Sequence, residues 1–340
     1  MNKYAVLANP GHNRVYFEAS KKLAISELEI VFKGATNIKE EYIGGVFYIT
    51  FEHDKELDID NIETLSKLSF VYALFELVED KLLKPIELVN YKYVNDNLST
   101  ILKYTGKTNE LFTRMMINVA LASSDTNAKG DVNLLDPIAG KGTTLFEGLI
   151  QGFNVYGVEI GDKVVNESYH FMKKYMEIEK YKHERKIDKI TGKGKSLLGR
   201  RYAINIARTK EELRNKETRH FELISGNSIN SDQFYQKNFF DIIVGDLPYG
   251  VQHGNVTREK QSSLTRNPVE LINGCRSSWY KILKKGGVMV LSWNSFIVPH
   301  SELKKLLEDV GFRVLDEDRY SSFEHMVDKS IKRNIIVAKK

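Results

Sequence analysis

Hydrophobic and polar positions follow different periods in two parts of the chain, and the first eighty residues mix strand-like and helix-like periods. Four apolar segments predict strands: YAVLAN, ATNIKEEYI, GGVFYITFE and FVYALFELVED. Two helices are predicted, one from Arg14 to Phe32 and one over IDNIETLSKL, which Asp58 or Asp60 can cap. Gly44 and Gly45 suit a hairpin turn between the second and third strands. The resulting β-α-β-β-α-β order is the ferredoxin-like α+β plan, which by itself indicates no function.

From residue 131 the pattern changes to short apolar strands that alternate with helices. The strands are VNLLD, FNVYGVEI, FELISG, FFDIIVG and GGVMVLSWN, followed by FRVLDEDRY and RNIIVAKK. The alternation predicts an α/β fold with a mostly parallel sheet covered on both faces, and the short last connection predicts an antiparallel final pair. We therefore expect a seven-stranded Rossmann-like domain over 99–340, a ferredoxin-like domain over 1–84 and a linker over 85–98.

Composition narrows the cellular setting. The 340 residues carry a net charge of +5, so the chain is mildly basic and nucleic acid is permitted as a partner. A single cysteine, Cys275, excludes a disulfide framework and a cysteine-based zinc cluster. The N-terminal segment lacks the apolar core of a signal peptide, and no uninterrupted apolar run approaches bilayer length. These features favour a cytoplasmic protein with no membrane contact and no obligate protein partner in evidence.

The loop after the first strand of the second domain, DPIAGKGTTLFEG, is rich in glycine. Gly140 and Gly142 allow a tight turn and a close approach of the backbone to a ligand. A nucleotide-triphosphate loop requires Ser or Thr after Gly-Lys, but Lys141 is followed by Gly142. A dinucleotide loop requires a third glycine where Leu145 stands. Both phosphate ligands are therefore disfavoured, and an ordinary glycine turn before a helix remains the alternative.

A carboxylate follows at the end of the second strand, where Glu159 lies in YGVEI. Ligands of open α/β sheets bind beyond the carboxyl ends of the strands, and a carboxylate there can accept both hydroxyl hydrogens of a ribose. A ribose ligand without phosphate suits this loop, and S-adenosylmethionine has that character. Asp136 would then face the ammonium of its amino-acid tail, and Asn227 with Ser228 would face the adenine. An exposed glutamate and a polar turn are the alternatives for these positions.

The segment DLPYG ends the fourth strand, beside the first strand in this topology. Methylation of an exocyclic base amine is difficult because the nitrogen lone pair is delocalised into the ring. The Asp246 carboxylate and the Leu247 carbonyl could accept the amine hydrogens, and Pro248 would fix the backbone between them. Tyr249 would offer a ring on which a flipped base stacks. We interpret the segment as a pincer that orients the amine, with a simple turn as the alternative.

Three motifs together, DPIAGKGTTLFEG, YGVEI and DLPYG, resemble the donor loop, ribose acid and catalytic motif of class I S-adenosylmethionine-dependent amino-methyltransferases. ILKYTGKTNELFTRMMINVAL is similar to their helical lead-in, and the chain over roughly 98–340 most resembles the Trm11-like family of tRNA guanosine N2-methyltransferases. The resemblance implies S-adenosyl-L-methionine as cofactor, RNA as partner with tRNA favoured, and catalytic roles for Asp246, Leu247, Pro248 and Tyr249. The implied donor-binding residues are Asp136, Ala139, Gly140, Gly142, Thr143, Thr144, Glu159, Asn227 and Ser228.

Two features depart from that family. Its motif is typically D-P-P-Y-G, and Leu247 replaces the first of the two prolines, although the backbone carbonyl is retained. The N-terminal region has little room for the THUMP RNA-binding domain that relatives often carry. The second departure weakens the case for tRNA more than the case for methyl transfer.

A basic insert near 180–220 separates the second and third predicted strands. Its cations, with Tyr202 among them, suit phosphate contacts, and a solvated helical excursion or partly disordered loop is the alternative. The cations are Lys182, Arg185, Lys186, Lys189, Lys193, Lys195, Arg200 and Arg201. The polar segment VQHGNVTREKQSSLTRN is where a target loop would sit, with His253 as a loop residue rather than a catalytic base.

Three functions remain open on these residues. The first is an RNA methyltransferase that acts on an exocyclic amine, with guanine N2 in tRNA favoured. The second is an adenine-N6 methyltransferase on DNA or RNA, because related motifs serve that amine. The third is a catalytically inactive, methyltransferase-like RNA-binding protein, against which the loop glycines, Glu159 and Asp246 argue.

Overall fold

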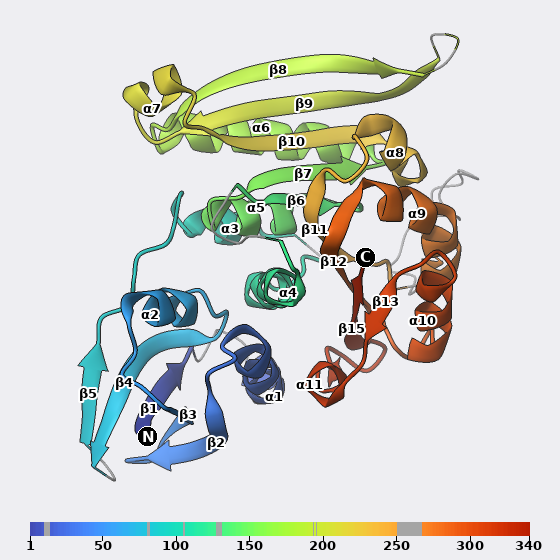
Figure 1. Cartoon of the computed structure of the whole chain (residues 1–340). Helices are drawn as coiled ribbons and strands as arrows, with labels where there is room; N and C mark the ends of the chain where they lie inside the picture. The colour runs from blue at the N-terminus through green and yellow to red at the C-terminus, as the bar shows by residue number, and fades with distance from the viewer. Residues whose placement is uncertain are drawn as a thin grey trace.

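The computed structural model describes residues 1–9, 14–79, 82–104, 106–126, 131–192, 194, 196–249 and 267–340. These residues form two sheets of different size, and Figure 1 shows the smaller sheet and its helices below the larger one. Within the described ranges, no helix is both long enough and apolar enough to cross a membrane.

The small domain contains the β-α-β-β-α-β order that the sequence predicts, followed by one more strand. Its five strands lie in the order β2-β3-β1-β4-β5. Asp58 caps α2 by accepting the backbone N–H of Asn61, and Gly44 and Gly45 both have positive φ in the turn after β2. Pro85, where the predicted linker begins, lies in β5. The elements are β1 (Asn2–Ala8), α1 (Arg14–Val31), β2 (Thr36–Ile43), β3 (Val46–His53), α2 (Ile59–Ser66), β4 (Val71–Glu79) and β5 (Leu82–Ile86).

The predicted helical lead-in consists of α3 (Asn97–Ile101) and α4 (Glu110–Ser123), and α4 packs against α1 of the small domain. Asn118 on α4 donates hydrogen bonds to the Glu27 carboxylate of α1 at 2.7 Å and to the Lys67 carbonyl at 2.9 Å. Glu27 is fully buried and also accepts the backbone N–H of Ser69 at 3.0 Å. Burial raises the pKa of the Glu27 carboxyl. These buried polar contacts fix the small domain against α4.

Over the ranges that the structure describes, the large sheet has ten strands rather than seven. Its main path runs β13-β15-β12-β11-β6-β7-β10-β9-β8, and β14 (His325–Met326) pairs with β15. Neighbours from β10 through β7, β6 and β11 to β12 are parallel. β15 is antiparallel to both β12 and β13, which confirms the predicted direction of the last pair. The seven expected strands are β6 (Asn133–Asp136), β7 (Asn154–Glu159), β10 (Arg219–Gly226), β11 (Phe240–Asp246), β12 (Leu283–Asn294), β13 (Arg313–Leu315) and β15 (Lys332–Lys339).

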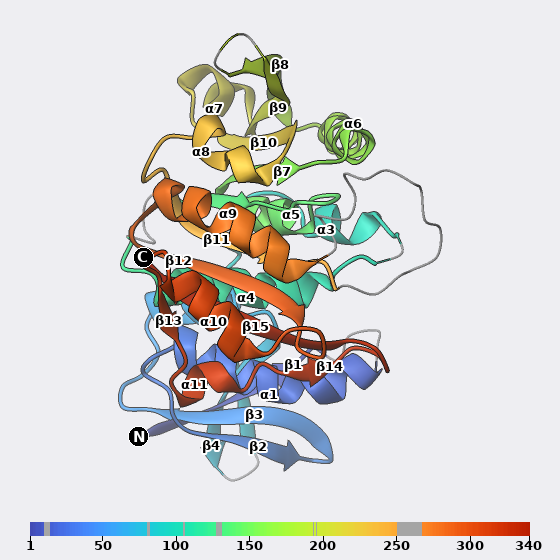
Figure 2. The same cartoon turned by 90° about the vertical axis from the view of Figure 1, so that its right-hand side faces the viewer.

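Helices cover both faces of the large sheet, as Figures 1 and 2 show. One face carries α4, α5 (Thr143–Ile150) and α6 (Asp162–Ile178), whose buried side chains include Phe112, Leu145 and Met172. The other face carries α8 (Ser231–Phe234), α9 (Pro268–Ile282) and α10 (His300–Glu308), with Trp279 and Leu303 in the core. A short α11 (Asp318–Ser321) follows β13. Because apolar side chains fill both faces, polar groups of the central strands reach a ligand mainly at the strand ends.

The basic insert forms two strands and a short helix, which corrects the alternative of a helical excursion or disordered loop. β8 (Lys182–Thr191) pairs antiparallel with β9 (Leu197–Ala207), β9 pairs antiparallel with β10, and α7 (Lys210–Asn215) leads back to the sheet. Tyr202 is buried against Tyr169 of α6, with ring centroids 5.2 Å apart, whereas Arg200 is exposed. The β8–β9 hairpin therefore extends one edge of the sheet. Lys193 and Lys195 lie outside the described residues.

Candidate functional site

The loop between β6 and α5 is shaped by two glycines in left-handed conformations. Gly140 and Gly142 have φ of 51° and 96°, which few other residues adopt. Ala139 donates its backbone N–H to the Val158 carbonyl at 2.9 Å, which anchors the loop to β7. A Cβ atom on Gly140 would meet no atom within 4 Å, so this glycine borders open space. α5 begins at Thr143, directly after the loop, and the open space at Gly140 leaves room for a ligand.

Asp136 ends β6 and is buried beside this loop. Its side chain is 3% exposed and accepts hydrogen bonds from the Ile138 backbone at 3.0 Å and from the Thr144 hydroxyl. Burial raises the pKa of Asp136 to about 7, and the nearby carboxylates of Asp246 and Glu159 add to the increase. The Asp136 carboxyl is therefore divided between its neutral and ionised forms near pH 7. A cation placed next to it would favour the ionised form.

Glu159 ends β7, as predicted, and its carboxylate reaches back to the loop. One oxygen accepts the backbone N–H of Gly140 at 3.0 Å, and the other accepts that of Gly161 at 2.8 Å. These bonds fix the carboxylate but occupy only one of the two acceptor sites on each oxygen. Glu159 can therefore accept two further hydroxyl hydrogens, as a ribose would require.

Asn227 and Ser228 follow β10 but have different surroundings. Asn227 is exposed, and its side-chain oxygen accepts the backbone N–H of Ile229 at 3.0 Å. Ser228 is buried, and its hydroxyl accepts the indole N–H of Trp279 at 3.0 Å. The Ser228 side chain is thus engaged in packing, and Asn227 is the better candidate of the two for a side-chain contact with a ligand.

A cavity of about 270 Å³ joins these strand ends to the predicted catalytic motif. Glu159, Asn227 and Ser228 line it from one side, and Asp246 and Pro248 line it from β11 and the turn that follows. Apolar atoms complete the wall, from Pro137, Ile138, Val158, Ile160 and Leu271. The other predicted donor-binding residues do not line this cavity: Asp136, Ala139, Gly140, Gly142, Thr143 and Thr144. The volume is close to the lower end of the range for small-molecule sites, about 300–1,000 Å³.

Asp246 is surrounded by hydroxyl donors. Thr108, Ser292 and Tyr249 all donate hydrogen bonds to its carboxylate, the last at 2.6 Å. The Tyr249 hydroxyl lies 2.6 and 2.7 Å from the two carboxylate oxygens, so the three hydroxyl donors together fix the group in one orientation. The next residue, Leu247, is 1% exposed, and its backbone N–H bonds the Ser292 carbonyl at 2.8 Å. The first half of the motif is therefore rigidly attached to β12.

Tyr249 makes contacts that the sequence does not reveal. Its hydroxyl donates to Asp246 and accepts the Nε hydrogen of Arg333, from β15, at 2.8 Å. The Arg333 guanidinium also lies over the rings of Tyr249 and Phe112, 5.2 and 4.7 Å from their centroids. Burial and the adjacent Asp246 charge raise the pKa of the Tyr249 hydroxyl. Tyr249 is thus a neutral donor that orients Asp246, and its stacking on a base stays a prediction.

The neighbours of the motif are drawn from distant parts of the chain. Thr108, Ser292 and Arg333 belong to the lead-in segment, β12 and β15, and no local pattern marks them. Sequence reasoning also missed Ile160, which lines the cavity and is 47% exposed. The sequence shows only that it is an apolar residue directly after Glu159. Gly250 of the motif lies outside the described residues. The predicted target loop, with His253, also lies outside them, except for its last residue, Asn267, which caps α9.

Comparison with known proteins gives a family match for the large domain. Residues 113–291, just over half of the 340, match the model of RMKL-like methyltransferase domains. No curated protein matches the sequence. TrmN from Thermus thermophilus is similar in structure, at 11% identity over 100% of both chains and a TM-score of 0.44. An rRNA methylase from Streptococcus thermophilus is 10% identical over 70% of this chain and 99% of its own, with a TM-score of 0.33. A SAM-dependent methyltransferase from Archaeoglobus fulgidus is 15% identical over 62% of this chain and 87% of its own, with a TM-score of 0.33.

Proposed function

Since the chain belongs to the family of RMKL-like methyltransferase domains, we propose that it methylates an exocyclic base amine of RNA, with guanine N2 in tRNA as the favoured target. S-adenosyl-L-methionine is the methyl donor, and when bound it supplies an electrophilic methyl group on a positively charged sulfur. The proposal rests on one observation above all: Glu159, Asn227 and Asp246 line the same cavity. A place for a ribose and a place for an amine are therefore adjacent.

The residues around the cavity fit this donor. Gly140 borders open space, and both oxygens of Glu159 keep an acceptor site for the ribose hydroxyls. Ile138 and Ile160 would flank the adenine, and Asn227 would contact its polar edge.

Asp136 would pair with the ammonium of the donor's amino-acid tail, directly or through water. Its carboxyl is buried beside the loop, where an unpaired negative charge is costly. A bound ammonium would offset that cost by stabilising the ionised form. Donor binding and the ionisation of Asp136 should therefore be coupled.

The amine would be oriented by Asp246 and the Leu247 carbonyl. Each would accept one amine hydrogen, which turns the nitrogen lone pair away from the ring and toward the methyl group. The three hydroxyls on Asp246 hold this acceptor in place before the base arrives, so little reorganisation accompanies transfer. As the new carbon–nitrogen bond forms and the methyl carbon–sulfur bond breaks, the amine becomes acidic, and Asp246 is the adjacent carboxylate that can receive the proton it loses.

RNA as the substrate is supported by the motif resemblance and by the exposed cations of the β8–β9 hairpin. Arg185, Lys189 and Arg200 are exposed there and can contact phosphates. Arg201 is less suited, because its guanidinium pairs with Glu222 at 3.1 Å and donates to a backbone carbonyl. The small domain, with its ferredoxin-like order of elements, would add a second surface for the RNA.

Mass spectrometry of nucleosides tests the proposal. The purified protein is incubated with donor and unmodified tRNA transcripts, and N2-methylguanosine is the expected product. N6-methyladenosine would instead support the adenine-specific alternative. Donor titration by calorimetry addresses the inactive alternative, because a protein that has lost donor binding would give no heat.

A further inference from the structure

A cleft of about 800 Å³ lies between the small domain and the large domain, and it shares no lining residue with the cavity at Asp246. Its walls come from β4 and the connection after β5, with Tyr72 and Tyr91, and from α4, with Arg114. Tyr93 and Tyr181 complete a set of four lining tyrosines. Clefts between domains are common ligand sites, and this one is rich in aromatic rings.

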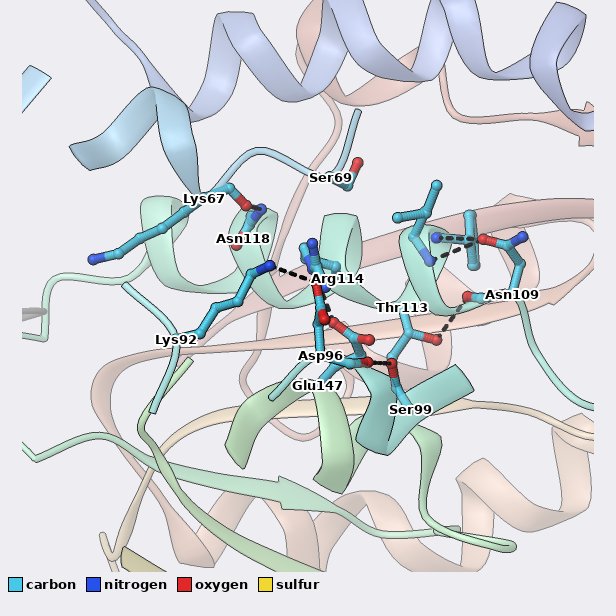
Figure 3. A network of polar contacts seen from close by, with 12 residues as sticks. Lys67, Ser69, Lys92, Asp96, Ser99, Asn109, Thr113, Arg114, Asn118 and Glu147 are labelled. Carbon is cyan, nitrogen blue, oxygen red and sulfur yellow. Dashed lines mark hydrogen bonds and ion pairs between the residues drawn. The ribbon is translucent and has the colours of Figure 1, made fainter. Parts of the chain in front are cut away.

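The cleft is held in a fixed shape by buried polar contacts. Asn118, one helical turn after Arg114 on α4, bonds both Glu27 and the Lys67 carbonyl of the small domain. Figure 3 shows Asn118 beside Lys67 and, further along, Arg114 beside Glu147. A ligand would therefore enter a preformed space, without first ordering the two domains.

The cations of the cleft are already paired with carboxylates. Arg114 donates its Nε hydrogen to Glu147, which is fully buried, at 2.8 Å. Lys92 bonds Asp96, as Figure 3 also shows. Two positive charges thus meet two negative charges, so the cleft offers little net attraction for phosphate. Recognition here must depend on stacking and hydrogen bonding.

The four tyrosines differ in their exposure and in whether their hydroxyls form hydrogen bonds within the chain. Tyr93 donates its hydroxyl to the Ile206 carbonyl at 2.9 Å, and the Tyr181 hydroxyl accepts the Asn95 backbone N–H at 3.1 Å. Tyr72 is 64% exposed, and Tyr91 is half-buried near Arg114. Tyr72 and Tyr91 are therefore the rings best placed to contact a ligand.

We propose that this cleft binds unpaired nucleotides of the RNA substrate, whose bases stack on Tyr72 and Tyr91. Stacking tolerates any base and needs a single-stranded segment. Thr108 bonds Asp246 and Arg114 follows six residues later, so the first turns of α4 connect the cleft to the proposed catalytic motif. Nucleotides that flank the target base would reach the cleft. This inference rests on the proposed RNA substrate.

The test compares two equally exposed tyrosines of the small domain. Tyr72→Ala is the test variant, and Tyr42→Ala is the control, because Tyr42 is also 64% exposed but lies on β2 and does not line the cleft. Binding of a labelled single-stranded RNA is measured by fluorescence anisotropy at two salt concentrations. Tyr72→Ala should bind about five- to a hundredfold more weakly than the control, by a similar factor at both salts. Tyr72→Phe should bind like the parent protein.

Kinetics separate this inference from the proposed function. In methyl transfer to RNA, Tyr72→Ala should raise KM and leave kcat nearly unchanged. Equal binding by Tyr72→Ala and Tyr42→Ala, with the parent protein still methylating RNA, would overturn the cleft assignment alone. A parent protein that binds the donor but neither binds nor methylates RNA would overturn the RNA substrate and the cleft assignment together.

Discussion

The centre of the large sheet and its hairpin edge hold their charged side chains in opposite ways. At the ends of β7 and β11, Glu159 and Asp246 accept hydrogen bonds from backbone or hydroxyl groups on several elements. On β8 and β9, Arg185, Lys189 and Arg200 are exposed. The centre thus fixes each carboxylate through several partners, whereas these hairpin cations are accessible to solvent.

This difference separates two tasks that a methyltransferase acting on a large substrate must perform. Orientation of a reacting atom depends on position and is lost when one group is removed. Attraction of a polyanion depends on the number of cations, and each contributes a small, salt-dependent share. Substitutions at the centre should therefore give large and specific effects, and substitutions on the hairpin should give small and general ones.

The largest effect is expected from Asp246→Ala. The substitution removes one proposed acceptor for the amine and leaves the loop between β6 and α5 in place, so the transfer rate should fall by about 10²–10³ while donor affinity changes little. Single-turnover transfer with saturating donor measures the rate. Asp188→Ala is the matched control, because Asp188 is a carboxylate of the hairpin that pairs only with Lys186 among the salt bridges of the described residues. If Asp246→Ala methylates at the parental rate, the motif is only a turn.

The same contrast explains how much could be predicted from sequence. Glu159 and Asp246 end short apolar strands, and Gly140 lies in the loop after another, so both their elements and their shared edge could be predicted. β8 is an edge strand with mostly exposed residues, and its charged sequence has no apolar face to reveal it. The Tyr249–Arg333 contact joins residues 84 positions apart, and only the order of strands brings them together.

Glu159→Ala should weaken donor binding about tenfold or more. The variant would lose the proposed hydrogen bonds from the ribose to a charged acceptor, a loss of about 1.5–3 kcal/mol in binding free energy. Calorimetric titration gives the dissociation constant. Because Glu159 also fixes the Gly140 backbone, the thermal unfolding of the variant without donor is the control. An unchanged dissociation constant would contradict the ribose assignment.

Donor affinity should fall about fivefold from pH 7 to pH 6, because the ionised share of Asp136 falls from about a half to about a tenth. Its pKa of about 7 means that donor binding below this pH must release a proton. The stability of the donor-free fold changes with pH in the opposite direction. Because folding raises the pKa of Asp136, the protonated carboxyl stabilises the fold at pH values below the pKa of the unfolded chain. This contribution is lost as the pH rises through about 7. Calorimetry in buffers of different ionisation heat counts the released proton. The Asp136→Asn variant should bind the donor weakly and release no proton. If donor affinity depends on pH equally in the variant and the parent protein, Asp136 does not pair with the donor's ammonium.

The smallest effect is expected on the hairpin, where one face carries a row of cations. Side chains alternate along a strand, so Arg185 and Lys189 share a face, and the register places Arg200 opposite Lys189. Lys186 points to the other face and pairs with Asp188 at 2.9 Å. If the row contacts phosphates, Arg185→Gln should make the log–log salt dependence of RNA binding shallower by about 0.7. Lys186→Gln, which changes the net charge equally, should leave the slope nearly unchanged. Equal slopes for the two variants would mean that the hairpin acts only through its overall charge.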